Sequence, residues 1–113
     1  MHSKTILITF VFTIFTSVSS YLCPSICQCA NFISNCSNLE LFYFPKITVW
    51  AKHVVLEGNN LSFEAFYDVN FKDYKVLETL NLNKNYIEFY PEMMTYELIS
   101  LRKLMMSYNM IKT

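Results

Sequence analysis

The sequence is 113 residues long, which allows one small domain at most, and its formal net charge at pH 7 is zero. Nucleic-acid-binding domains carry a basic patch or stripe, so this charge balance argues against DNA or RNA as a ligand. The single glycine, Gly58, excludes a glycine-rich phosphate loop. Hydrophobic residues make up 53% of the chain, above the about 45–50% of soluble domains, and part of that excess lies at the N-terminus.

The N-terminus predicts a secretory signal peptide over residues 1–20. Lys4 supplies a positive charge, and residues 6–15 (ILITFVFTIF) form an apolar run. Val18 and Ser20 are small enough for the −3 and −1 positions of a cleavage site after Ser20. A membrane-spanning helix needs about 20 apolar residues, and this run is shorter and interrupted by threonines. We therefore expect a secreted, extracellular mature chain without a membrane span.

All four cysteines cluster in the pattern C-P-x-x-C-x-C-x6-C, at Cys23, Cys27, Cys29 and Cys36. Behind a signal peptide, an even number of cysteines predicts disulfides, because the secretory compartment is oxidising. Four cysteines allow three pairings, and the spacing does not choose among them. A zinc site is the alternative, but zinc sites usually show paired C-x2-C knuckles, which this pattern lacks.

Three windows after the cysteines share the pattern L-x-x-L-x-L-x-x-N-x-L. They are residues 51–61 (AKHVVLEGNNL), 77–87 (LETLNLNKNYI) and 101–111 (LRKLMMSYNMI), and they start 26 and 24 residues apart. Alternating side chains at the centre of each window predict a short strand. The side chains expected to point into the core are Val54, Leu56, Leu80, Leu82, Leu104 and Met106.

The cysteine pattern at 23–29, Cys36-Ser37, Leu41 with Phe44-Pro45, and the three windows resemble an extracellular leucine-rich-repeat protein with a cysteine-rich N-terminal cap. The resemblance implies an α/β solenoid, a leucine-rich-repeat arc with a short parallel sheet on its concave face. It also implies the disulfides Cys23–Cys29 and Cys27–Cys36. The organisation expected is a signal peptide (1–20), a cap (21–50) and repeats at 51–76, 77–100 and, incomplete, 101–113.

The outward side chains of the three strands would form the concave face, which such proteins use for binding. These are His53, Val55, Glu57, Thr79, Asn81, Asn83, Lys103, Met105 and Ser107. They mix polar and apolar types with little net charge, which suits a protein ligand and offers nothing for polyanions. A plain solvated sheet face is the competing interpretation.

The asparagine of each window can bond backbone groups that a tight turn leaves unpaired. We therefore expect Asn59, Asn85 and Asn109 to stack as a ladder. Two N-x-S sequons add candidate glycosylation sites at Asn60 and Asn35. Asn60 should face solvent beside the ladder, whereas Asn35 adjoins a bridged cysteine, so Asn60 is the better candidate.

Nothing in the sequence favours catalysis, a cofactor or a metal. His53 has no nucleophile or second histidine at suitable spacing, and the carboxylates are scattered singly. Trp50 is expected to pack between the cap and the first repeat. The methionine pairs at 93–94 and 105–106 are expected to fill the core.

We therefore expect a non-catalytic secreted or cell-surface module for protein–protein recognition, a fragment or short form of a receptor, adhesion or matrix protein. Its partner would be a protein ligand or receptor. No C-terminal cap follows the third window, although repeat proteins normally shield their last repeat. The alternative is a small structural or decoy protein that associates with itself or with another repeat protein through the open edge at Leu104 and Met106.

Overall fold

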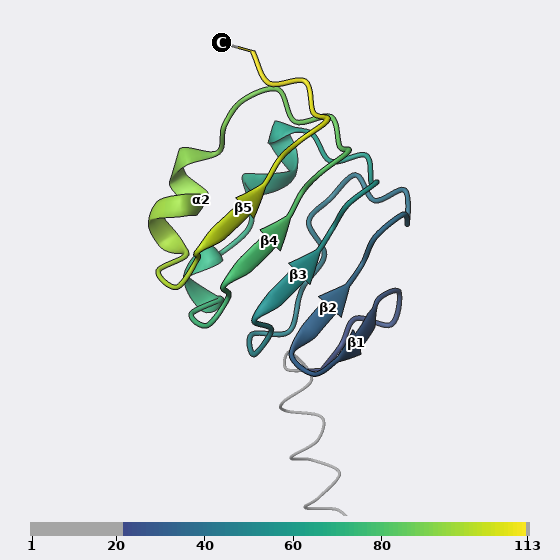
Figure 1. Ribbon diagram of the computed structural model, residues 1–113, viewed down its shortest axis with the longest axis vertical. Helices are drawn as coiled ribbons and strands as arrows, with labels where there is room; N and C mark the ends of the chain where they lie inside the picture. The colour runs from purple at the N-terminus through teal and green to yellow at the C-terminus, as the bar shows by residue number, and fades with distance from the viewer. Residues whose placement is uncertain (1–21, 113) are drawn as a thin grey trace, which may run out of the picture.

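The computed structural model describes residues 22–112, so the predicted signal peptide lies outside the described residues. A five-stranded sheet in the order β1-β2-β3-β4-β5 organises the chain (Figure 1). The first two strands are antiparallel, and each later strand runs parallel to the one before it. The strands are β1 (Gln28–Ala30), β2 (Ile33–Asn35), β3 (His53–Val55), β4 (Thr79–Asn81) and β5 (Lys103–Met105).

A tight hairpin joins β1 to β2. Ala30 pairs with Ile33, which leaves only Asn31 and Phe32 in the turn. Both turn residues have positive φ, at 51° and 64°, as a type I′ turn requires. This turn has the right-handed twist that lets two short strands pair without splaying.

Two disulfides hold this hairpin against the chain around it. Cys23 is bonded to Cys29 and Cys27 to Cys36, which is the pairing that the resemblance implied. The bridges span 6 and 9 residues, so each closes a short loop and stabilises the fold by roughly 2–3 kcal/mol in the chain-entropy picture. A small domain has little core, so these bridges matter to its stability.

The parallel strands keep one register across the three sequence windows. His53 lies opposite Thr79, and Thr79 lies opposite Lys103, at separations of 26 and 24 residues. The side chains of Val54 and Leu80 point inward and are buried, as the alternation predicts. Leu56 and Leu82 are likewise buried. Leu104 and Met106 are only half-buried, so the inward positions around β5 are less completely covered.

Short helical segments carry the chain from one strand to the next. They are the 3-10 helices η2 (Phe63–Phe66) and η3 (Phe71–Asp73) and the α-helix α2 (Glu92–Glu97). Figure 1 shows α2 beside the helical turns of the preceding connection. No helix of residues 22–112 is both long enough and apolar enough to cross a membrane.

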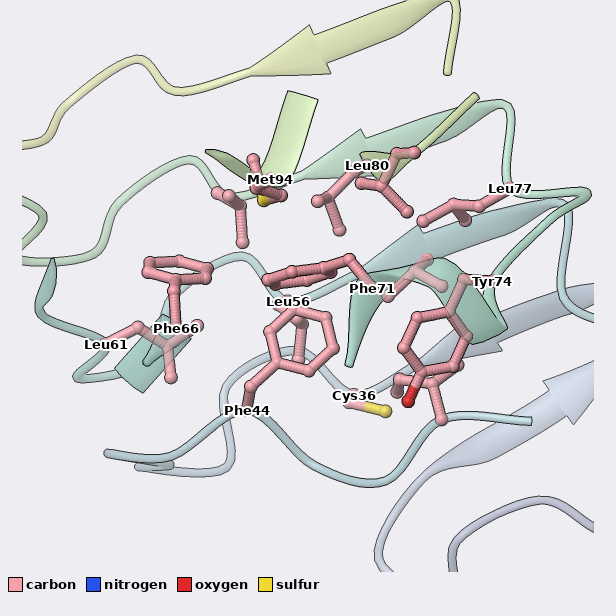
Figure 2. Close-up of a cluster of buried hydrophobic side chains, with 14 of the residues drawn as sticks. Cys36, Phe44, Leu56, Leu61, Phe66, Phe71, Tyr74, Leu77, Leu80 and Met94 are labelled. Carbon is pink, nitrogen blue, oxygen red and sulfur yellow. The ribbon is translucent and has the colours of Figure 1, made fainter. Parts of the chain in front are cut away.

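Aromatic rings fill the interior between the sheet and these connections (Figure 2). The ring of Phe44 lies 5.3 Å from that of Phe71, 6.0 Å from that of Phe66 and 6.4 Å from that of Tyr74, between centroids. Each fully buried large apolar side chain stabilises the fold by about 1.5–3 kcal/mol. Phe44 lies between β2 and β3, and the other three rings lie between β3 and β4, so the cluster joins two successive connections.

Two core expectations are wrong in part. Trp50 is 58% exposed instead of packed between the cap and the first window. Met94 is buried, but its neighbour Met93 is 74% exposed because α2 turns it away from the sheet. Met105 lies half-buried on the outward side of β5, while Met106 packs against the core.

Candidate functional site

The outward side of β3, β4 and β5 brings the nine predicted binding residues together; we call it the outward face. The strand registers place them in three rows across the sheet. The first row holds His53, Thr79 and Lys103, the second holds Val55, Asn81 and Met105, and the third holds Glu57, Asn83 and Ser107. Seven of the nine are half-buried, and Lys103 and Ser107 are exposed. Most of the outward face is thus partly shielded from solvent.

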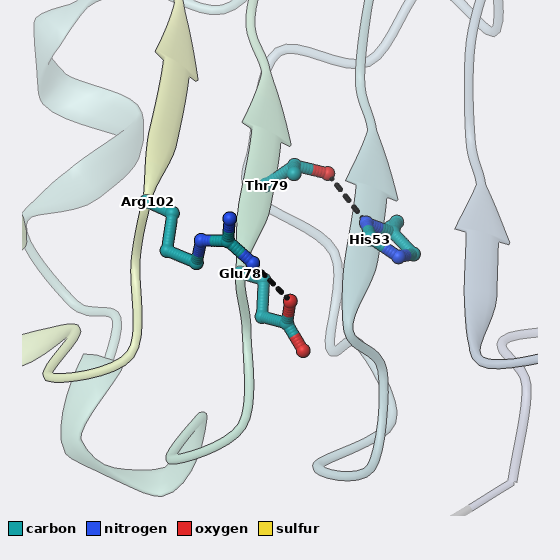
Figure 3. Close-up of polar contacts among 4 residues, drawn as sticks. All are labelled: His53, Glu78, Thr79 and Arg102. Atoms are coloured by element: carbon teal, nitrogen blue, oxygen red, sulfur yellow. Dashed lines mark hydrogen bonds and ion pairs between the residues drawn. The ribbon is translucent and has the colours of Figure 1, made fainter.

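Two polar pairs tie neighbouring strands together at the start of this face (Figure 3). Nδ1 of His53 lies 2.8 Å from Oγ1 of Thr79, within hydrogen-bond distance. Next to it, the guanidinium of Arg102 lies 3.5 Å from the carboxylate of Glu78. Because the Arg102 side chain is exposed, this ion pair contributes at most about 1 kcal/mol. Both pairs orient side chains more than they stabilise the fold.

Asparagine amides hold the other end of the face. Oδ1 of Asn83 accepts a hydrogen bond from the backbone N–H of Ser107 at 2.7 Å, between adjacent strands. Oδ1 of Asn81 accepts one from the N–H of Asn83 at 2.9 Å. These bonds fix two of the predicted ligand-facing side chains in place before any partner arrives, which lowers the entropy lost on binding.

The face extends one strand further than the sequence windows predict. Ile33 lies opposite His53, and Asn35 lies opposite Val55, so β2 adds both side chains to the first two rows. Sequence reasoning missed them because the inward residue of β2 is Ser34 and the next inward residue, just after the strand, is Cys36, and neither gives a leucine signal. Both are fully buried. The alternation of Ile33, Ser34 and Asn35 was the only available sign.

The three window asparagines occupy equivalent positions beneath the turns that follow the strands. Nδ2 of Asn59 donates to the carbonyls of Leu56 and Cys36, each at 2.9 Å. Its Oδ1 accepts from the backbone N–H groups of Leu39 and Leu41. Each amide therefore bridges its own turn and the segment one window earlier.

Asn85 and Asn109 repeat this arrangement along the sheet. Nδ2 of Asn85 donates to the carbonyls of Leu82 and Leu56, and Nδ2 of Asn109 to those of Met106 and Leu82. Asn59 and Asn85 are buried, whereas Asn109 is half-buried.

No protein-family model matches this chain, and comparison with curated proteins likewise finds no match.

Both sequon asparagines are exposed. Asn60 follows the buried Asn59, and its backbone N–H donates to the carbonyl of Leu41 at 2.7 Å. Oδ1 of Asn35 instead accepts from both Oγ and N–H of Ser37, the third residue of its own sequon. Glycosylation of either residue stays a prediction.

Tyr74 is a titratable residue whose pKa is changed by its surroundings. Burial raises the pKa of the Tyr74 phenol, the Asp73 carboxylate adds to this, and a hydrogen bond with the backbone of Ile47 opposes it. Tyr74 belongs to the core rather than to the outward face. Among residues 22–112, no group of three or more His, Cys, Asp or Glu side chains is arranged to hold a metal ion.

Proposed function

We propose that this chain is a secreted leucine-rich-repeat module without catalytic activity, and that it recognises another protein through its outward face. The observation that carries the proposal is the amide ladder. Asn59, Asn85 and Asn109 bond the same backbone groups at successive turns, next to parallel strands in one register. Such an arrangement is expected of stacked repeats that share one interior.

The make-up of the outward face favours a protein as the ligand. Ile33, Val55 and Met105 supply apolar contact area between amide and hydroxyl groups, and the formal charges of Glu57 and Lys103 cancel. Protein interfaces combine apolar and polar groups in this way. A standard interface needs about 800 Å² on each partner. The four strands β2 to β5 offer more surface toward this area than the three windows alone.

Secretion is tested by expressing the full chain in a eukaryotic secretory host. We expect the protein in the medium, beginning at Tyr21 and with both disulfides closed. Retention inside the cell with an uncleaved N-terminus and free thiols would contradict the proposal. Placement in the extracellular space is supported by the two disulfides, which form in oxidising compartments.

Recognition is tested by probing an array of extracellular domains with multimerised protein. Val55→Glu and Met105→Glu place charge in the outward face and should abolish any specific binding. Met93→Glu places the same charge on an exposed site of α2 and serves as the control. A hit that survives both outward-face variants but is lost in the control would contradict the assignment of the binding face.

The half-burial of Leu104 and Met106 favours a second candidate function, association through the edge of β5. Exposed strand edges over apolar side chains promote pairing between chains. Light scattering across a range of concentrations tests this candidate. Dimers that dissociate on Leu104→Asp would support it, and a strict monomer would remove it.

A further inference from the structure

A pocket of about 200 Å³ opens between the connection that contains η2 and η3 and the helix α2. It is separate from the outward face, whose residues do not line it. An apolar cavity of about 150 Å³ in an engineered protein admits benzene. This pocket is therefore large enough for a compact organic group.

Aromatic side chains form much of the pocket wall. Phe63, Phe66, Tyr67 and Phe71 all line it, and Phe66 and Phe71 are anchored in the core. The Phe63 ring makes edge-to-face contacts with the rings of Tyr67, at 5.3 Å, and Phe89, at 5.6 Å. The wall is thus held in place by packing. Aromatic ring faces carry partial negative charge and attract cations that approach them.

Two carboxylates stand beside this aromatic wall. Glu92 and Glu97, at the first and last positions of α2, both line the pocket, and no Lys, Arg or His does. Within residues 22–112 the only ion pair joins Arg102 to Glu78, so neither carboxylate is neutralised by a neighbour. The pocket therefore combines an apolar interior with uncompensated negative charge.

We propose that this pocket binds an organic cation whose charge is carried by a methylated ammonium group. The rings would contact the methyl groups, and Glu92 and Glu97 would supply the opposite charge. A bare ammonium such as that of lysine is strongly hydrated and costs more to remove from water. Quaternary ammonium groups are the cations that aromatic pockets recognise best. This site is independent of the proposed recognition face.

The decisive comparison uses two probes of the same shape, choline and its uncharged counterpart 3,3-dimethyl-1-butanol. Each is titrated into the disulfide-bonded protein while the methyl NMR signals of Met93 and Met94, which line the pocket, are followed. We expect saturable shifts with choline and an affinity about fivefold or more weaker for the neutral alcohol. Equal affinities, or no saturable shift with choline, would overturn the proposal.

Variants then test the role of the carboxylates. The double substitution Glu92→Gln and Glu97→Gln should weaken choline binding about fivefold or more and leave the affinity of the neutral alcohol unchanged. Glu64→Gln removes an exposed carboxylate from η2 that does not line the pocket, and it should change neither affinity. An equal loss in the control, or no loss in the double variant, would contradict the site. Should the double variant fail to fold, the two-probe comparison on the unaltered protein still decides.

Discussion

Oδ1 of Asn85 accepts a hydrogen bond from the backbone N–H of Leu61, 24 residues earlier in the chain, at 3.0 Å. The same side chain donates to the carbonyls of Leu56, Leu82 and Asn83 at 3.0–3.1 Å. One buried amide thus satisfies backbone groups from two successive turns. The bonds to Leu61, Leu56 and Leu82 are buried, so removal of the amide leaves backbone groups of the interior without their partner.

Asn85→Ala should lower the free energy of unfolding by about 2–4 kcal/mol, because each buried backbone group left unsatisfied costs about 1–3 kcal/mol. Urea denaturation of both proteins measures the difference. Asn60→Ala is the matched control, since Asn60 is exposed, and its effect should stay within about 0.5 kcal/mol. A similar small loss in both variants would show that the amide ladder does not stabilise the fold.

Gly58→Ala should destabilise the turn after β3. Gly58 has φ of 74°, and a Cβ at this position would meet Oδ1 of Asn38. The left-handed conformation costs a residue with a Cβ about 1–2 kcal/mol, so we expect a loss of at least that size in urea denaturation. Repeating the substitution in an Asn38→Gly background removes the clash but not the backbone cost. A loss that vanishes in that background would contradict the backbone explanation.

Phe32→Gly should stabilise the protein, although it removes a large aromatic side chain. Phe32 has φ of 64° and is 61% exposed, and Lys52 Nζ lies 5.3 Å from its ring centroid. Relief of the left-handed strain, about 1–2 kcal/mol, offsets both the freedom that glycine adds to the unfolded chain, about 0.5–1 kcal/mol, and the loss of that exposed contact, about 0.5 kcal/mol, so we expect a net gain of up to about 0.5 kcal/mol.

Phe42→Gly is the matched control for that substitution. Phe42 is 73% exposed but does not have a positive φ. Glycine there adds unfolded-state freedom and removes the edge-to-face contact with the Tyr43 ring, at 5.5 Å between centroids, so it should lower stability by about 1–2 kcal/mol. Melting temperatures that shift in the same direction for both variants would contradict the assignment of strain to the hairpin turn.

Stability should fall at high pH because of Tyr74. Burial raises the pKa of this phenol above its ordinary value of 10.0, so the unfolded chain loses the proton at a lower pH than the folded chain does. Over that interval the unfolded state binds fewer protons, and the free energy of unfolding decreases as pH rises. At pH values below the pKa of Tyr74 in the unfolded chain, the protonated phenol makes its full contribution to stability.

Melting temperatures between pH 8 and pH 11 test the effect, with Tyr74→Phe as the control. The variant keeps the ring that packs against Phe44 and should retain the fold near neutral pH. It should also show a shallower decline above pH 10. An equally steep decline in both proteins would assign the pH dependence to other groups.

Strand positions in the three windows were predictable because the signal is local. Side chains on a strand alternate, so Val54, Leu56, Leu80 and Leu82 identify the buried side without knowledge of the connections. The asparagine positions follow from the same windows. An asparagine three residues after the last inward leucine can hydrogen-bond the backbone groups that the following turn leaves unpaired. The disulfide pairing came from the cap resemblance, because four cysteines in sequence leave three pairings open.

What could not be predicted depends on contacts between segments. Ser34 and Cys36 are buried only because the hairpin places β2 beside β3, and neither residue carries an apolar strand signal. The exposure of Trp50 and Met93 likewise depends on how the connections turn. The pocket beside α2 arises between two connections, so no single stretch of sequence contains its aromatic wall and both its carboxylates.

The central claim is that β3, β4 and β5 are successive parallel strands of one sheet in repeat register. Nuclear Overhauser effects measured on isotopically labelled, disulfide-bonded protein test it most directly. The N–H of Leu56 donates to the carbonyl of Asn81 at 2.8 Å, and that of Leu82 donates to the carbonyl of Met105 at 2.7 Å. We expect cross-peaks that join these strands in parallel order, with both amides slow to exchange. Cross-peaks in antiparallel order, or a helical pattern through residues 53–55, would contradict the account.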